Sequence, residues 1–131
     1  MTKMTKEIEG YEAYTITQEG DVYSTKWNTP RKLKPQRATQ SKKGYYQIRL
    51  YDESGELGKL KYVHRVVWET FRGEIPDGLE IDHMDGDTSN NSLANLQVLT
   101  RKQNTNKYQR ETLGILLRER RNELCQDYDT L

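Results

Sequence analysis

Short apolar runs separated by turn residues characterise the first half of the chain. Residues 10–24 consist of two β-prone runs on either side of a turn that contains Gly20, a pattern that predicts a β-hairpin. Residues 45–51 alternate between apolar and polar side chains as a half-buried strand does, and residues 57–62 are expected to return as its partner. Residues 26–43 show no clear period and contain two prolines, so we expect a loop or an extended arm there.

The apolar period becomes helical after residue 61. Within residues 62–71 the apolar side chains recur every three to four positions, and Gly73 follows as a stop signal, so a helix is predicted. His64 lies inside this apolar run, and we expect it to be a packed structural residue. A further amphipathic helix is predicted over residues 112–126, where leucines form one stripe and arginines line the other side.

A strand–loop–strand–helix unit is predicted between these two helices. Residues 79–82 and 96–99 are short apolar runs, and residues 85–91, rich in Asp, Ser and Asn, are expected to form a loop. Thr100 is a suitable N-cap for a helix that continues to about residue 109. The predicted fold class is therefore α+β, with a small antiparallel β-sheet module, then a ββα unit, then a C-terminal helix.

Composition narrows the class of protein. Of the 131 residues 31% are charged and 33% hydrophobic, yet nine Tyr and two Trp can still build a modest core. The single cysteine, Cys125, excludes a disulfide framework and a zinc site made of paired cysteines. There is no apolar signal core at the N-terminus and no run of membrane-spanning length, so we expect a cytoplasmic protein without a membrane partner.

The net charge of +1 hides a segregation of charges along the chain. Residues 26–49 carry eight Lys and Arg and no acidic side chains, whereas residues 73–100 carry six acidic side chains and no Lys or Arg. A basic arm beside an acidic centre suits a metal-using enzyme that acts on a polyanion, although a charge run can also be a merely solvated surface. The basic arm comprises Lys26, Arg31, Lys32, Lys34, Arg37, Lys42, Lys43 and Arg49.

Three polar residues in the ββα unit suggest phosphodiester hydrolysis. His83 directly follows Asp82 at the end of a predicted strand, so their side chains point to opposite faces, and Asn104 lies one turn into the following helix. A neutral histidine is a suitable base near pH 7, because an unperturbed imidazole has a pKa of ~6.5. One Asp oxygen and one Asn oxygen form a sparse set of hard ligands, which suits Mg²⁺, with Mn²⁺ as a substitute and no zinc.

The same stretch resembles a known family. Asp82-His83-Met84-Asp85-Gly86, followed by Asn90-Asn91, Asn95-Leu96, Thr100 and Asn104, is similar to the ββα-metal motif of HNH endonucleases, above all the phage and intron-associated homing endonucleases. The resemblance implies that His83 is the general base, that Asp82 and Asn104 hold the metal, and that Asn95 braces the loop and orients the His83 backbone. The final His of the eponymous pattern is replaced by Asn104, as in the Asn-type members, and Asn106 is the nearby alternative ligand.

The resemblance extends upstream and covers roughly residues 8–108. Residues 63–71 resemble the helix that precedes the motif, and residues 10–24 resemble a small nuclease-associated DNA-binding module. We accordingly expect a β-rich DNA-binding module with its basic arm at residues 1–61, an HNH nuclease domain at residues 62–110, and a helix with a tail at residues 111–131.

The resemblance implies a metal-dependent endonuclease that cuts double-stranded DNA, nicking one strand site-selectively as a monomer or weak homodimer in the cytoplasm of a phage-infected bacterial cell. DNA contacts are expected from the basic arm and from Arg101 and Lys102 at the start of the helix. RNA as a substrate stays open. The alternatives are a DNA-binding regulator that keeps the fold without cutting, and a phage-type protein-interaction or inhibitor module that uses the leucine stripe.

Overall fold

A four-stranded antiparallel sheet forms the N-terminal part of the chain. The structure is a computed structural model that describes residues 4–39, 43–55, 58–110 and 113. The predicted hairpin is confirmed, because strands β2 and β3 pair across the turn that contains Gly20. A further strand precedes this hairpin, and the sequence pattern did not predict it. In the order in which they pair, the strands of this sheet are β1 (Thr5–Ile8), β2 (Tyr11–Thr17), β3 (Val22–Ser24) and β4 (Arg31–Lys32).

A second sheet has three antiparallel strands, β5 (Gln36–Arg37), β6 (Tyr46–Tyr51) and β7 (Gly58–Tyr62). The pairing of β6 with β7 confirms the predicted partner strands. Residues 26–43, predicted to be a loop or an extended arm, contain two short strands that were not predicted, since β4 pairs with β3 and β5 pairs with β6. Both short strands are exposed, so they are held by backbone pairing and have no buried face that would give an apolar period.

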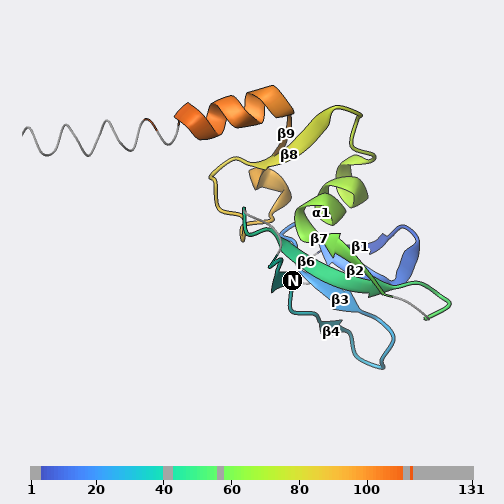
Figure 1. The fold of residues 1–131 in the computed structure, drawn as a ribbon. Coiled ribbons are helices and arrows are strands. Elements are labelled where there is room, and N and C mark those ends of the chain that lie inside the picture. The colour runs from blue at the N-terminus through green and yellow to red at the C-terminus, as the bar shows by residue number, and fades with distance from the viewer. Residues whose placement is uncertain (1–3, 40–42, 56–57, 111–112, 114–131) are drawn as a thin grey trace, which may run out of the picture.

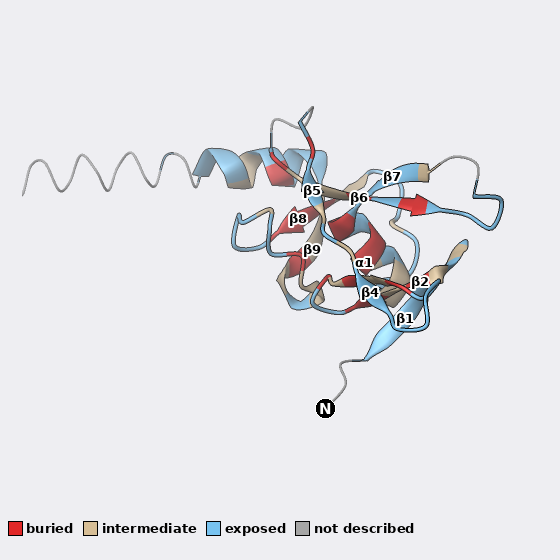
Figure 2. Cartoon of the chain, turned by 90° about the horizontal axis from the view of Figure 1, so that it is seen from below, coloured by how far each residue is buried: buried red, intermediate tan, exposed pale blue. Residues whose placement is uncertain are grey.

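Helix α1 (Val63–Arg72) follows β7 directly and packs against both sheets (Figure 1). Its buried face includes Val63, Val66 and Val67, and the helix ends at Gly73, whose φ of 90° is favourable for glycine. One hydrophobic cluster runs from Ile8 to Leu96 and so lies on both sides of the predicted boundary between residues 61 and 62. Figure 2 shows the buried positions gathered around this helix. The boundary itself stays a prediction.

The ββα unit is present as predicted. Strands β8 (Leu79–His83) and β9 (Leu96–Thr100) pair antiparallel, with a single turn of 3-10 helix, η1 (Leu93–Asn95), in the connection. Residues 101–110 are helical. Thr100 is the N-cap: its Oγ1 accepts from the Gln103 N–H at 3.1 Å, and the Thr100 N–H donates to Gln103 Oε1 at 2.9 Å. This reciprocal capping box fixes where the helix begins.

The helix predicted over residues 112–126 lies outside the described residues, apart from Leu113. Among the described residues, no helix is long and apolar enough to cross a membrane.

His64 is buried on the face of α1 that adjoins the second sheet, which confirms its predicted packed position. It is 5% exposed, and its ring centroid lies 4.7 Å from that of Tyr45 and 5.1 Å from that of His83. Within the described part of the chain, its Nδ1 has no hydrogen-bond partner. Burial, helped by the nearby charges of His83 and Arg65, lowers the pKa of His64 to about 3.

Replacing Leu50 with alanine tests the core. Leu50 is fully buried in β6, so Leu50→Ala is expected to lower the free energy of unfolding by about 2–5 kcal/mol through lost transfer energy and an unfilled cavity. Leu60→Ala on the neighbouring β7 is the matched control, because Leu60 is 50% exposed. Urea denaturation measures both changes, and an equal loss in the two variants would contradict this core assignment.

The low pKa of His64 predicts how stability depends on pH. Below pH 6.5 the unfolded chain binds a proton that the folded chain refuses until about pH 3, so the protein loses stability as the pH falls through this window. The loss approaches about 1.4 kcal/mol per pH unit. His64→Phe removes this dependence without leaving a buried polar atom, so its denaturation midpoint is expected to fall less between pH 7 and 4. If the denaturation midpoints of the two proteins fall by the same amount over this pH range, the low pKa assigned to His64 is wrong.

Candidate active site

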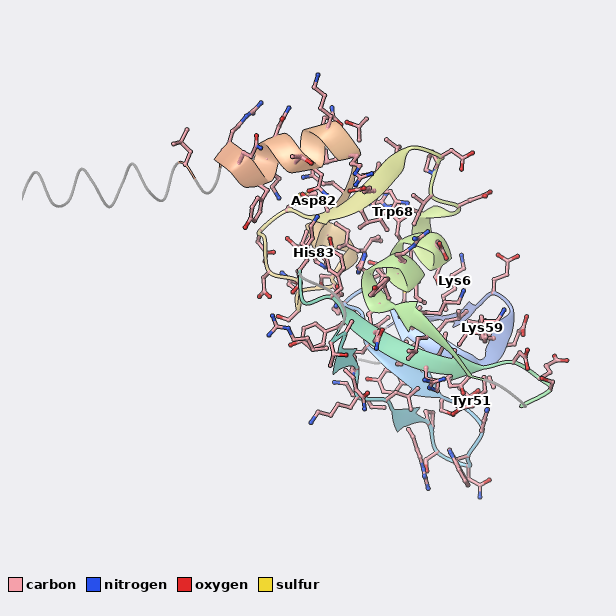
Figure 3. All side chains as sticks on the ribbon, in the orientation of Figure 1. Lys6, Tyr51, Lys59, Trp68, Asp82 and His83 are labelled. Carbon is pink, nitrogen blue, oxygen red and sulfur yellow. The ribbon has the colours of Figure 1, made fainter. Side chains whose placement is uncertain are left out.

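A pocket of about 520 Å³ lies where the β8–β9 hairpin, its loop and the following helix meet. It brings together the three residues on which the sequence analysis concentrated, Asp82, His83 and Asn104. Figure 3 labels Asp82 and His83 at the end of the hairpin, beside the helix of residues 101–110. The other lining residues are Lys43, Tyr45, Gly86, Thr88, Lys107 and Tyr108.

Asp82 is held on the helix side of the hairpin. It is 9% exposed and lies opposite Gln97 in the strand register, and Gln97 Nε2 donates to Asp82 Oδ2 at 2.8 Å. Lys107 Nζ donates to the same oxygen at 2.7 Å. Within the described residues, both hydrogen bonds to this carboxylate therefore fall on Oδ2. Sequence reasoning found Asp82 but neither partner.

His83 is held from the other side of the hairpin, as the alternation of a strand requires. It is 4% exposed, and its Nε2 lies 2.8 Å from Asn91 Oδ1. A carbonyl oxygen can only accept, so Nε2 carries the ring proton and Nδ1 is the nitrogen that can act as a base. The Tyr45 ring stacks on the imidazole at a centroid distance of 5.8 Å. Asn91, interpreted from sequence mainly as a loop former, thus sets the tautomer of His83.

Asn95 braces the loop as the family resemblance implies. Its Oδ1 accepts from the Asp85 N–H at 3.1 Å, and its Nδ2 donates to Asp85 Oδ1 and to the Asn90 carbonyl, each at 2.9 Å. Its backbone carbonyl accepts from the Met84 N–H at 2.8 Å, directly after His83. Asp85 therefore belongs to the loop framework, and hydrogen bonds from Asn90, the Asp87 backbone and Asn95 lower its pKa to about 2.

The structure places Asn104, and not Asn106, with Asp82 and His83. Asn104 is 8% exposed, and its Nδ2 donates to Glu80 Oε2 at 3.1 Å, so the amide oxygen is the atom left for a ligand. Asn106 lines a different recess, together with Gln97 and Leu99. Two positions along a helix correspond to a rotation of about 200°, which explains why the two asparagines face different ways.

The oxygen atoms of this pocket fit a hard divalent cation. Within the described residues there is no group of three or more His, Cys, Asp and Glu side chains that could hold a metal. Asp82 and Asn104 supply one carboxylate and one amide oxygen, the sparse set that Mg²⁺ accepts when water and phosphate complete its shell. A positive charge already lies among these oxygens, because Lys107 Nζ contacts Asp82 Oδ2 and the carbonyls of His83 and Met84.

The basic residues predicted to contact DNA lie on the surface. Every member of the basic arm in the described part of the chain is exposed, and so are Arg101 and Lys102, while Lys42 lies outside the described residues. Of the described members of the arm, Lys43 alone lines the pocket that contains His83. The remaining DNA contacts stay predictions.

Comparison with known proteins shows which family and which relatives the chain resembles. Residues 61–106 match a family model described as HNH endonuclease. The chain is 39% identical over 112 residues to DNA endonuclease I-HmuI of Bacillus phage SP01, covering 84% of this chain and 60% of that protein. It is 36% identical over 104 residues to YosQ of Bacillus subtilis (strain 168), an SPbeta prophage-derived protein named as an HNH homing endonuclease, covering 76% of this chain and 54% of YosQ.

A solved structure has the same fold. That structure, titled "DNA binding and cleavage by the HNH homing endonuclease I-HmuI", matches with a TM-score of 0.69 and 35% identity over 83% of this chain and 59% of the other. The chain thus spans somewhat over half the length of these relatives. The family model covers the β8–β9 hairpin, the start of the following helix and the pocket residues Asp82, His83 and Asn104, while the structural match extends over most of the chain. Residues 61–106 therefore match the HNH endonuclease family, and most of the chain resembles I-HmuI in sequence and fold.

Proposed function

We propose that the chain is a Mg²⁺-dependent endonuclease that hydrolyses phosphodiester bonds of double-stranded DNA in the pocket of Asp82, His83 and Asn104. The observation that carries the proposal is the buried His83, whose Nε2 is held by Asn91 so that Nδ1 can act as a base beside a buried carboxylate. The likeness to I-HmuI, whose solved structure is titled for DNA binding and cleavage, supports DNA as the substrate.

Each residue of the pocket has a separate task in this reaction. His83 takes a proton from the attacking water at Nδ1, and Asn91 keeps the ring in the required tautomer. Asp82 and Asn104, which both line the pocket, would hold the divalent cation. When bound, that cation supplies positive charge to the phosphate oxygen and to the leaving oxygen. Lys43 at the rim would contact the substrate phosphate.

The framework of the loop protects this geometry from distortion. Asn95 ties the Asp85 backbone to the Asn90 carbonyl, which fixes the path of the loop that follows His83. One such centre reacts with one phosphodiester bond at a time, so a monomer is expected to nick one strand. Exposed residues of the basic arm would grip the duplex, and affinity should then fall with salt by a log–log slope of about −0.9 per phosphate neutralised.

His83→Ala tests the proposed base. With Mg²⁺ and a library of genomic DNA fragments, strand-resolved mapping of ends should show that cleavage falls by at least about 100-fold, the usual contribution of a general base. A gel-shift assay should show that the affinity for DNA is unchanged, because the proposed contacts with the duplex backbone are made by the basic residues and not by His83. Leu60→Ala changes an exposed side chain of β7 and is the control for effects of protein preparation and folding.

Two results would count against the proposal. Cleavage by His83→Ala at the rate of the unaltered protein would remove His83 from the mechanism. Binding by the unaltered protein without any cut in the library would instead favour a DNA-binding regulator on the same fold.

The pair Asn104→Ala and Asn106→Ala tests the second metal ligand. Only Asn104 shares the pocket with Asp82, so Asn104→Ala is expected to weaken Mn²⁺ binding at least tenfold, a loss of about 1.4 kcal/mol. Asn106→Ala should stay close to the unaltered protein. Electron paramagnetic resonance of free Mn²⁺ gives both affinities, and the reverse order of effects would assign the ligand to Asn106.

A further inference from the structure

The proposed hydrolysis leaves the contacts of Lys107 unexplained. Lys107 comes from the helix of residues 101–110, one turn after Asn104, and lines the same pocket. Its Nζ lies 2.7 Å from Asp82 Oδ2, 2.9 Å from the His83 carbonyl oxygen and 3.2 Å from the Met84 carbonyl oxygen. Its side chain is 23% exposed and that of Asp82 is 11% exposed, so this ion pair is largely shielded from water.

The ion pair between Lys107 and Asp82 matters because both side chains are largely buried. A carboxylate withdrawn from water is costly unless a positive charge or several donors compensate it. Gln97 supplies one neutral donor to Asp82 Oδ2, and Lys107 supplies the full positive charge. Lys107 therefore does in this structure what a metal ion on Asp82 would do, which is to neutralise the carboxylate.

The ammonium on Asp82 Oδ2 and a divalent cation on the same carboxylate would oppose one another, even if the cation bound to Oδ1. Lys107 Nζ already lies in direct contact with the carboxylate that the proposed function assigns to the metal. A cation bound to Asp82 would lie within a few ångströms of Nζ, where like charges repel strongly even at the effective dielectric of a protein surface. Gln97 can keep Asp82 oriented when the lysine leaves, because its hydrogen bond comes from the paired strand β9.

We propose that Lys107 is a built-in counter-cation of Asp82, which neutralises this carboxylate in the metal-free protein and competes with the divalent cation for it. The proposal rests on the proposed function, because it takes Asp82 as a metal ligand. Its consequence is that the protein binds the metal less tightly than its oxygen ligands alone would allow. The Lys107 side chain is long and already 23% exposed, so the displaced ammonium can move toward solvent.

The test is the affinity of the DNA-free protein for Mn²⁺, measured by isothermal titration calorimetry at low salt. Lys107→Met keeps the length of the side chain and removes its charge, and it should bind Mn²⁺ at least tenfold more tightly. Lys107→Gln is a second uncharged variant that retains a donor for Asp82, and it should shift the affinity in the same direction. Lys102→Met removes an exposed charge from the same helix and should change the affinity less than threefold.

Thermal unfolding gives an independent readout. In EDTA, Lys107→Met should melt below the unaltered protein, because Asp82 is then buried without its counter-charge, and added Mn²⁺ should raise its Tm by more. Unchanged or weaker Mn²⁺ binding in both uncharged variants would overturn the proposal and leave Lys107 as a structural tie between helix and hairpin.

Asp82→Asn separates this failure from failure of the proposed function. If Asp82→Asn abolishes Mn²⁺ binding while the lysine variants do not tighten it, only the counter-cation role is wrong. If Asp82→Asn leaves binding unchanged, the ion is not held at Asp82, and the metal assignment and the counter-cation role fall together.

Discussion

The buried carboxylate of Asp82 is the constraint on which the rest of the site depends. A charge that is 9% exposed at the end of a strand needs compensation from groups brought to it by the fold. Gln97 reaches it because β8 and β9 pair in a register that sets the two residues opposite one another. Lys107 reaches it because Thr100, the last residue of β9, caps the helix of residues 101–110, so that this helix follows the hairpin directly. The contacts that build the pocket are therefore the same ones that compensate the buried charge of Asp82.

The core makes this arrangement rigid. Ile81 and Leu96, one from each strand of the hairpin, belong to the hydrophobic cluster that also contains the buried face of α1. On the other side, the rings of Tyr45 and His64 pack against His83 and connect the second sheet to the site. The N-terminal part therefore positions the imidazole as well as carrying basic residues. This packing explains why the hairpin and the two sheets share one hydrophobic core, although the hairpin is proposed to carry catalytic residues and the sheets to carry basic residues that contact DNA.

Much of the architecture could be predicted because it depends on local signals. Alternating side chains identified β6, helical spacing identified α1, and Thr100 marked the start of the last described helix. The strands β4 and β5 were not predicted because both are exposed and each is held only by pairing with a neighbouring strand, β3 or β6. Such pairing leaves no period in a stretch of two residues.

The candidate site likewise has one part that the sequence predicted and another that only the structure shows. Asp82, His83, Asn95 and Asn104 were found from a motif, and the structure brings them to one hairpin and its helix. The contacts of Asn91, Gln97 and Lys107 were missed, since strand register, loop path and helix rotation decide them and none of these can be deduced from neighbouring residues. The choice between Asn104 and Asn106 had the same origin, because it depends on how the helix is rotated against the hairpin.

The central claim is that the oxygens of Asp82 and Asn104 hold the catalytic cation beside His83. A crystal structure of the protein with a DNA duplex and Mn²⁺, recorded at the manganese absorption edge, tests this directly. We predict an anomalous peak within about 2.5 Å of an Asp82 carboxylate oxygen and of the Asn104 amide oxygen, a bonding distance for a divalent cation and oxygen. A peak bound elsewhere, with Lys107 still on Asp82, would contradict it.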